Sequence, residues 1–310
     1  MSWEQIFGAP GSAPFWLKLA CVAGFAWDAW LLWRDARRKF ADPAYAPALE
    51  RQRRHLAWNC MAGVVGNFLA TLGVGAFATT TALFKLKGSV DDIDIPGTLN
   101  VGDAFPTLVQ AFLFLGAVEM DPVTLVSMII AAILGARLGA RVVTGWDRAR
   151  VRLGMGVGLA IVGGVMLLRQ LGLAGGAGTA LGLSGWKLIV AVVVNACLGA
   201  LMNIGVGSFG PCLVLCATLG MDVVTAYPVM MGSCSLLMAF GNAPAFIKAS
   251  RYDLTATLAQ AVPGCVSVWA AYRFVRSLSV TALLWVVICV VFVTSALFLK
   301  DARRDLRRAH

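Results

Sequence analysis

Long apolar runs, separated by short polar and basic stretches, dominate the amino-acid sequence. Seven of them approach the ~20 residues that an α-helix needs to cross a lipid bilayer: Phe15–Trp33, Leu99–Val118, Pro122–Arg141, Leu153–Leu168, Val223–Ile247, Leu254–Tyr272 and Thr281–Leu299. The composition agrees, because 59% of the residues are hydrophobic and 14% are charged, whereas soluble domains carry about 25% charged residues. The pattern predicts an all-α, polytopic membrane protein.

Two further apolar stretches, Leu56–Leu86 and Leu188–Leu219, are each cut by a Gly-rich break. The breaks read LGVGAF at 72–77 and IGVGSF at 204–209, so they lie 132 residues apart. The same spacing relates other identical residues: Gly88 and Gly220, Pro96 and Pro228, Asp121 and Asp253, Arg141 and Arg273, and Val143 and Val275. This spacing indicates an internal duplication, and each break is expected to be the tip of a broken membrane segment.

The basic residues help to decide between two topologies. If each broken stretch crosses the membrane once, the repeats are parallel and ten of the 26 Lys and Arg residues lie outside. If each stretch dips in and returns as a re-entrant hairpin, each repeat adds three crossings and the second repeat is inverted. That topology leaves outside only Lys18, Arg169, Lys187, Arg273 and Arg276. Because cytoplasmic loops are enriched in Lys and Arg, we favour inverted repeats, with the N-terminus outside and the C-terminus in the cytoplasm.

This topology divides the chain into five parts. They are an N-terminal transmembrane helix with a basic cytoplasmic loop (1–56), repeat one (57–171), a Gly-rich external linker (172–186), repeat two (187–300) and a basic cytoplasmic tail (301–310). The basic stretches at 34–55 and 144–152 are expected to be cytoplasmic loops. The residues before Phe15 lack the basic segment of a cleavable signal peptide.

The Gly-rich breaks suggest a chemistry. A helix that begins inside the membrane exposes free backbone N–H groups and the positive end of its dipole, and both favour an anion. Glycine lets a ligand approach the backbone closely. The expected binding residues are Gly73, Gly75, Ala76, Phe77, Thr79 and Thr80 in repeat one and Asn203, Gly205, Gly207, Ser208 and Phe209 in repeat two. The alternative is that the GxG pairs only allow tight helix packing.

The sequence places no Lys or Arg deep in an expected span. Dipoles alone would hold an anion weakly enough to release it, and two tips that meet near the midplane suit alternating access. We therefore expect a secondary transporter of a small anion. A passive anion channel is an alternative, and its flux would neither saturate nor respond to a proton gradient.

The two halves, each with a Gly-rich break and basic cytoplasmic loops, resemble the TauE/SafE-type anion exporters (the TSUP family). The resemblance runs from about Ala57 to Leu299 and leaves the first span as an addition. It implies export of a small sulfur-containing anion, such as sulfite, a sulfonate or sulfoacetate, across a bacterial inner membrane. Repeat one has Thr79 where repeat two has Pro211, a departure from the family's Gly-run-then-Pro pattern that bears on the substrate.

Two acids lie inside expected crossings, where ionisable residues usually have a function. Asp103, whose repeat mate is Ser235, is a candidate for proton coupling, or else an acid in a wet vestibule at a helix start. Asp28 could line the transport pathway, but it lies near Arg34, so we favour an acid that snorkels to the lipid interface.

The eight cysteines mostly fall inside apolar stretches, without CxxC or Cys/His spacing, and are expected to be small buried residues. However, Cys212 and Cys216 lie one helical turn apart beside the second break, and Cys234 lies on the next span. A membrane-embedded thiol enzyme is therefore the alternative function, and it would need a thiol with a lowered pKa.

The expected partners are the anion, the lipid bilayer and protons. The net charge of +10 resides in the loops, where it reports orientation and does not indicate nucleic-acid binding. We expect no catalytic residue, no metal ligand and no cofactor in a carrier of this kind. No pattern in the sequence specifies an oligomeric state.

Overall fold

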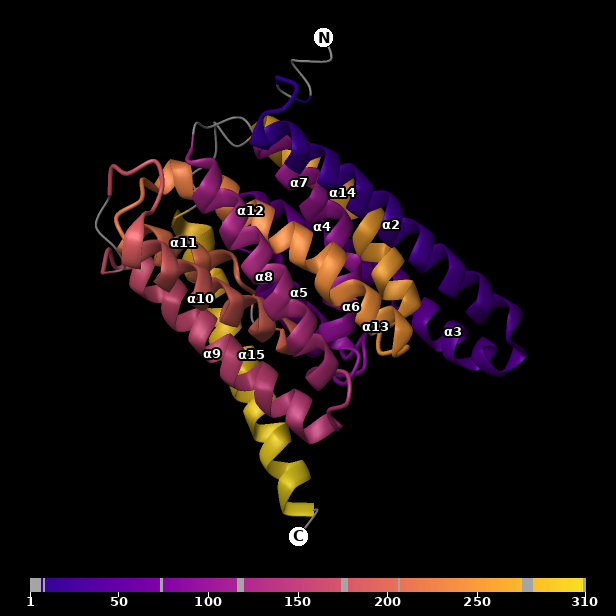
Figure 1. Cartoon of the computed structure of the whole chain (residues 1–310). Helices are drawn as coiled ribbons and strands as arrows, with labels where there is room; N and C mark the ends of the chain where they lie inside the picture. The colour runs from indigo at the N-terminus through magenta and orange to yellow at the C-terminus, as the bar shows by residue number, and fades with distance from the viewer. Residues whose placement is uncertain are drawn as a thin grey trace.

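The computed structural model describes residues 7, 9–72, 75–115, 120–173, 178–205, 207–274 and 281–308, and these residues fold mainly into helices (Figure 1). The helices are α2 (Ala13–Ala41), α3 (Ala46–Arg53), α4 (Leu56–Thr71), α5 (Ala76–Lys87), α6 (Ile95–Gly102), α7 (Ala104–Phe114), α8 (Pro122–Val143), α9 (Arg148–Gln170), α10 (Gly185–Leu201), α11 (Phe209–Thr218), α12 (Val223–Leu237), α13 (Ala243–Lys248), α14 (Leu254–Phe274) and α15 (Thr281–Arg308), with 3-10 turns η1 (Pro43–Tyr45) and η2 (Met202–Ile204) and the π-helical turn η3 (Met238–Asn242).

Five helical segments of the described chain are long and apolar enough to cross a membrane. They are Ala13–Ala41, Pro122–Val143, Gly185–Ile204, Thr225–Lys248 and Leu254–Arg273. Many large apolar side chains on these segments are exposed on the outside of the bundle, including Trp16, Val123, Leu138, Ile189 and Val262. Because such a surface needs an apolar solvent, the prediction of an all-helical, multi-pass membrane protein is confirmed.

Both Gly-rich breaks interrupt a helix. In the first, α4 ends at Thr71 and α5 begins after Gly75, which caps the new helix with φ of +85°. In the second, Gly205 has φ of +82° between η2 and the start of α11 at Phe209. A backbone with positive φ is strained for any residue with a Cβ atom, so glycine is what allows the chain to turn at these two points.

Each break forms the tip of an antiparallel helical hairpin. In the first hairpin, Trp58 near the start of α4 donates from Nε1 to the carbonyl of Leu83 near the end of α5, at 3.1 Å. Gly66 contacts Thr80 between the two helices. In the second hairpin, Lys187 at the start of α10 lies beside Gly220, just past the end of α11. In both cases the chain returns to the end from which it came.

The open ends of the two hairpins, called here the first and second mouth, lie at opposite ends of α8. At the first mouth, Asp91 follows α5 and pairs with Arg148, which follows α8, at 2.7 Å. At the second mouth, the N–H of Asp121, the residue before α8, donates to the carbonyl of Leu181 at 3.0 Å, and the N–H of Ala180 donates to Gly220 at 3.2 Å. The 22 residues of α8 separate the mouths by about 33 Å, since an α-helix rises 1.5 Å per residue.

Corresponding contacts occur in both halves of the chain. α4 packs closely on α14, where Gly63 lies against the backbone of Gln260. α10 packs closely on α8, where Asn195 donates to the carbonyl of Met128 at 2.8 Å. Residues 63 and 195, and residues 128 and 260, each differ by the repeat spacing of 132. Each hairpin therefore packs against the helix that the other half contributes.

Several expected boundaries were wrong. The segment expected to cross at Leu99–Val118 is divided between α6 and α7 at Asp103, because Pro106 has no N–H to donate to the carbonyl four residues earlier. In the second half, the π-helical turn η3 similarly interrupts the segment between α12 and α13, just before Pro244.

The basic stretches predicted as loops are also largely helical. α2 continues to Ala41, α3 covers Ala46–Arg53, and α9 begins as early as Arg148. Lys and Arg mark the side of the membrane, but they are good helix formers, so a run of them does not by itself end a helix. The helix α15, yellow in Figure 1, likewise extends past the rest of the bundle towards the C-terminus.

Candidate functional site

The tips of the two hairpins touch each other. A Cβ atom placed on Gly75 would lie 3.6 Å from the Cβ of Phe209, and one on Gly207 would lie 3.3 Å from the Cβ of Phe77. The two contacts are equivalent, because Gly75 and Gly207, and Phe77 and Phe209, are matched positions of the duplication. Two breaks that lie 132 residues apart in the sequence therefore form one centre, here called the tip contact.

The half-helices that start at the tip contact present backbone donors. Neither α5, after Gly75, nor α11, after Ser208, has a side-chain hydrogen bond capping its N-terminus. The N–H groups in the first turn of a helix have no partner within the helix, and the helix dipole places positive charge at the same end. Of the residues predicted to bind the anion, Ala76, Phe77 and Phe209 are buried here, while Gly73 lies outside the described residues.

The hydroxyl groups near the two breaks differ. Thr79, Thr80 and Thr81 on α5 are buried, and their Oγ1 atoms have no hydrogen-bond partner in the protein. Buried hydroxyls usually have one, so these three have unused hydrogen-bonding capacity, and that of Thr80 lies against Gly66 of α4. In the second half, Ser208 Oγ lies 2.8 Å from Cys234 Sγ and donates to Met202 Sδ at 3.4 Å. Repeat one therefore supplies the free hydroxyls.

Asn203, the asparagine expected to bind the anion, ties two helices together. Its Nδ2 donates to the carbonyl of Ala136 on α8 at 3.0 Å and to that of Ala200 on α10 at 3.1 Å. The donors that an anion would need are thus used in packing, which is the commoner role of a polar side chain between membrane helices. Its binding role stays a prediction.

The two intramembrane acids are both fully buried. Asp103 lies at the junction of α6 and α7, two turns past the start of α6, and its Oδ1 accepts from Asn67 Nδ2 at 3.0 Å and Gln260 Nε2 at 3.4 Å. The expectation that Asp28 snorkels was wrong, because α2 continues about three turns beyond it and its carboxylate has no partner and no exposure.

The cysteines of the thiol hypothesis are enclosed by apolar side chains. Cys212, Cys216 and Cys234 have no exposed surface and belong to one hydrophobic cluster with Phe209 and Leu213. A thiol in apolar surroundings is inert, since the reactive form is the thiolate. All eight cysteines are free. The expectation that they are buried holds for half of them, whereas Cys197 and Cys289 face the outside of the bundle.

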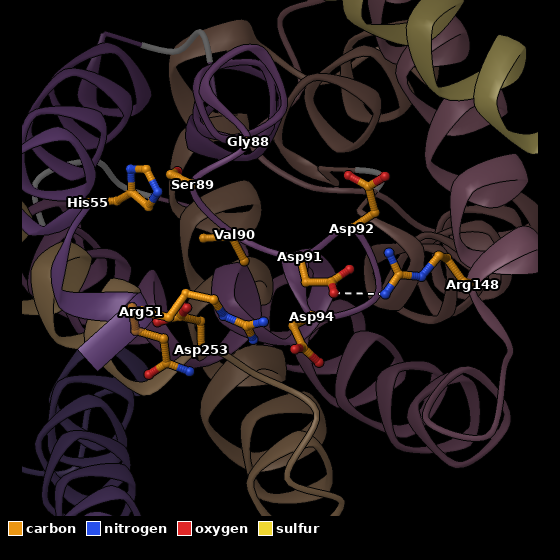
Figure 2. Close-up of a pocket in the computed structure, with 11 residues that line it drawn as sticks. Arg51, His55, Gly88, Ser89, Val90, Asp91, Asp92, Asp94, Arg148 and Asp253 are labelled. Atoms are coloured by element: carbon orange, nitrogen blue, oxygen red, sulfur yellow. Dashed lines mark hydrogen bonds and ion pairs between the residues drawn. The ribbon is translucent and has the colours of Figure 1, made fainter. Parts of the chain in front are cut away.

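A cavity that the sequence analysis missed opens at the first mouth (Figure 2). It has a volume of ≈ 330 Å³ and is lined by Arg51, Gln52, His55, Gly88, Ser89, Val90, Asp91, Asp92, Asp94, Arg148 and Asp253. These residues come from α3, the N-cap of α4, the turn after α5, the start of α9 and the residue before α14, so only the fold brings them together. The one local signal was the cluster of three aspartates at 91–94.

Charged groups around this cavity are closely coupled. Burial raises the pKa of Asp253 to about 6, and the negative charge of Asp94 adds to the shift. The pKa of Asp94 is raised by its own burial and by Asp91. In the lining of the cavity, Asp92 accepts from Lys85 and from Arg152, each at 2.7 Å.

The same two cations bind the C-terminal helix. Lys85 pairs with Asp301 at 2.8 Å and Arg152 pairs with Asp305 at 2.6 Å. This ion-pair network joins the end of α5 to α9 and α15. It has no charged equivalent at the matched positions of the second half, where Ala217 and Val224 replace Lys85 and Asp92.

Apolar spanning helices and two facing hairpins define a multi-pass helical membrane protein whose polar features lie inside the bundle. The family model of the sulfite exporter TauE/SafE matches residues 9–166 and residues 61–298. The chain belongs to the TauE/SafE sulfite exporter family, which is a family of transporters. No curated protein and no solved structure matches it.

Proposed function

We propose that this protein exports a small sulfur-containing anion, such as sulfite or an organosulfonate, and that the anion binds at the tip contact. The observation that carries the proposal is the reciprocal packing of Gly75 on Phe209 and of Gly207 on Phe77. It brings two uncapped helix N-termini to one place, and such termini bind anions. Family membership supports the chemical class of the substrate.

Transport proceeds by alternating access between two inverted repeats, 57–171 and 187–300, joined by the linker 172–186. Two observations support this architecture. The mouths open at opposite ends of α8, and each hairpin packs on a helix of the other half, as in an interface with two-fold symmetry. In such a transporter one repeat rocks against the other around a fixed site. Each re-entrant hairpin then forms the wall that separates the site from the opposite side of the membrane.

The distribution of basic residues supports the orientation. Arg51, Arg148 and Arg152 lie around the first mouth. Lys187 and Lys18 lie on the side of the second mouth. Lys187 lies at the mouth itself, and Lys18 contacts Phe112 near the end of α7, from which the chain continues to the start of α8 at this mouth. The positive-inside rule places the first mouth and the tail at 301–310 in the cytoplasm and the N-terminus outside. The membrane is the bacterial inner membrane.

The anion is held without a fixed positive charge. Backbone N–H groups of α5 and α11 and the free hydroxyls of Thr79 and Thr80 are the donors, and the phenyl rings of Phe77 and Phe209 bound the site. Binding by dipoles is favourable enough to select an anion and weak enough to release it. This balance is what a carrier with rapid turnover requires.

A transport assay tests the proposal. The purified chain is reconstituted into liposomes, and uptake of labelled sulfite is measured with sulfite, sulfoacetate, thiosulfate or taurine enclosed. We expect saturable uptake that is accelerated by an enclosed substrate, since a loaded carrier returns faster than an empty one. Uptake that does not saturate and is not accelerated by any enclosed anion would identify a passive channel and overturn the proposal.

A further inference from the structure

A column of buried polar side chains runs between α4 and α14. Asn59 and Asn67 lie on α4, Thr257 and Gln260 lie on α14, and Asp103 lies where α6 meets α7. All five have no exposed surface. Polar side chains buried in a membrane protein are costly unless they are paired, so such a concentration along one helix pair calls for an explanation.

Six polar atoms of this column have no hydrogen-bond partner in the protein. They are Asn59 Nδ2 and Oδ1, Thr257 Oγ1, Gln260 Oε1, Asn67 Oδ1 and Asp103 Oδ2. Lipid cannot satisfy such groups. Water can, where a polar site offers it several partners. Unsatisfied atoms on neighbouring side chains therefore indicate a connected set of water sites.

The register of the two helices connects the column to the cavity at the first mouth. α4 and α14 run parallel, because Gly63 lies against Gln260 and Asn67 lies against Gly264. This register places Asn59 level with Thr257. One turn earlier, immediately before the two helices begin, come His55 and Asp253, and both line the cavity (Figure 2).

The spacing along the column suits water. Asp253, Thr257 and Gln260 follow one another at intervals of four and three residues, which places them on one face of α14. The two intervals rise about 6 Å and about 4.5 Å, and the whole path from Asp253 to Gln260 rises about 10 Å. A single water molecule bridges a gap of this size between two polar groups.

Asp103, at the inner end, carries a carboxyl group without a basic partner. Asn67 and Gln260 both donate to its Oδ1, and its Oδ2 is unpartnered. The titratable groups towards the middle of the helices packed around it are Cys21 and Asp28 on α2, Cys60 on α4, Tyr227 and Cys234 on α12, and Cys265 on α14. Further groups lie towards the helix ends: Arg34, Asp35, Arg37, Arg38 and Lys39 on α2, Lys87 on α5, and Tyr272 and Arg273 on α14. The cations Lys18, Lys85 and Lys248 lie near helix ends, and Lys85 is held by Asp92 and Asp301. A proton is the simplest means of neutralising such a group.

The column exists in one half of the molecule. The positions that match Asn59, Asn67, Asp103, Thr257 and Gln260 are Ala191, Gly199, Ser235, Leu125 and Met128. Hence the equivalent helix pair, α10 and α8, offers no comparable row of polar groups. The column between α4 and α14 therefore leads to Asp103 from the first mouth.

We propose that Asp103 takes up and releases a proton from the cavity at the first mouth, through water held by Gln260, Thr257 and Asn59. The reaction is a simple protonation, in which the carboxylate accepts a proton that a chain of water molecules delivers from the cavity. That this proton drives anion transport rests on the proposed function. The protonation of Asp103 and its access to the cavity at the first mouth do not rest on the proposed function.

Infrared difference spectroscopy on the purified full chain tests protonation without any substrate. The measurement is made in the Asp253→Asn background, because burial raises the pKa of Asp253 to about 6 and its protonation would give a band of its own. In sodium-free buffer, lowering the pH should then produce the carbonyl band of a protonated carboxylic acid, and Asp103→Asn should remove that band. Asp28→Asn is the matched control, since Asp28 is also fully buried and unpartnered, and it should retain the band. A band that persists in Asp103→Asn, that does not change with pH, or that responds to sodium ions in place of pH would overturn the proposal.

The route is tested by the rate at which the same band shifts in heavy water. Asn59→Leu and Thr257→Val should slow the shift by roughly tenfold or more, because each removes polar partners of a buried water. Ser267→Ala is the control on the same helix pair, as Ser267 already donates to the carbonyl of Val64 at 2.6 Å, and it should leave the rate unchanged. Equal rates in all three variants would overturn the route.

Transport measurements separate this proposal from the proposed function. With thiosulfate as the probe, Asp103→Asn should abolish uptake driven by a proton gradient and retain exchange of enclosed for external thiosulfate. Uptake by Asp103→Asn that still follows the proton gradient would refute coupling through Asp103. If the wild-type chain exchanges none of the tested anions, the proposed function fails, while the infrared result still decides whether Asp103 binds a proton.

Discussion

Enlarging the glycines of the tip contact is expected to abolish transport without preventing membrane insertion. The perturbation is Gly75→Leu or Gly207→Leu. Ala would place its Cβ at ordinary contact distance from Phe209 in the first case, and slightly too close to Phe77 in the second. The remaining atoms of a leucine side chain must then occupy the space between the two tips, where the anion is proposed to bind.

The magnitude follows from two costs. Gly75 has φ of +85° and ψ of 130°, a backbone conformation that costs a residue with a side chain about 1–3 kcal/mol. Overpacking between the tips adds about 1–3 kcal/mol. A loss of only about 2 kcal/mol of binding or of tip geometry lowers the flux roughly 30-fold. Insertion depends on the hydropathy of whole segments and should be unaffected.

The assay is the initial rate of sulfite counterflow in proteoliposomes, divided by the amount of inserted protein. Gly88→Leu is the matched control, because Gly88 also has a positive φ, of +63°, but a Cβ atom there would meet nothing within 4 Å. It carries backbone strain of about 1–2 kcal/mol away from the tips and should retain at least about half of the flux. Normal flux in both Gly75→Leu and Gly207→Leu would refute the assignment of the breaks as the site.

Three further predictions follow from the site description. Replacing the three enclosed thiols, Cys212, Cys216 and Cys234, by Ser should leave sulfite flux within about twofold of the wild type, because buried thiols are inert. A complete loss of flux would favour the thiol enzyme. Asp92→Asn should lower the free energy of unfolding by about 1–3 kcal/mol, since Asp92 pairs with two cations that are mostly buried. Unfolding is followed by tryptophan fluorescence, and an unchanged free energy would show that the ion-pair network is not stabilising. Burial raises the pKa of Asp253 from 3.8 to about 6, so its contribution to stability is present at low pH and is lost as the pH rises from about 4 to about 7. Asp253→Asn should flatten the fall in melting temperature across that range, and an equally steep fall would contradict the assignment.

The breaks could be predicted because their signal is local. Glycine at 75 and 205 is required by the backbone itself, and a repeated spacing of 132 residues shows in the sequence alone. The number of apolar runs likewise reports the fold class, since hydropathy and span length are directly related. Helix ends were harder to predict, because Arg148 and the basic residues of α3 favour a helix as readily as a loop.

The polar parts of the site depend on tertiary contacts that no local pattern carries. Ser208 is a plausible donor in the sequence, but the fold places Cys234 beside its hydroxyl. Asn203 is adjacent to the break, yet its amide reaches α8 and is used there. Asp253 and Asp91 lie more than 150 residues apart, and their shared cavity exists because the start of α14 packs beside the turn that follows α5.

The two mouths are closed by different interactions, and this bears on how the transporter moves. At the first mouth, side-chain ion pairs join α5 to α9 and α15 through Asp92, Lys85 and Arg152. At the second mouth, backbone contacts join Gly178 to Gly220, and Asp121 to Leu181. Exposed ion pairs weaken with ionic strength more than buried ones, so the salt-sensitive pair at the first mouth is the more exposed Arg148–Asp91 pair. Backbone hydrogen bonds do not depend on ionic strength in this way. The closure at the first mouth can therefore respond to salt and to proton concentration in the cavity beside it, while the closure at the second mouth responds mainly to packing. A fold built from two similar halves thus acquires different sensitivities on its two sides through the side chains in which those halves differ.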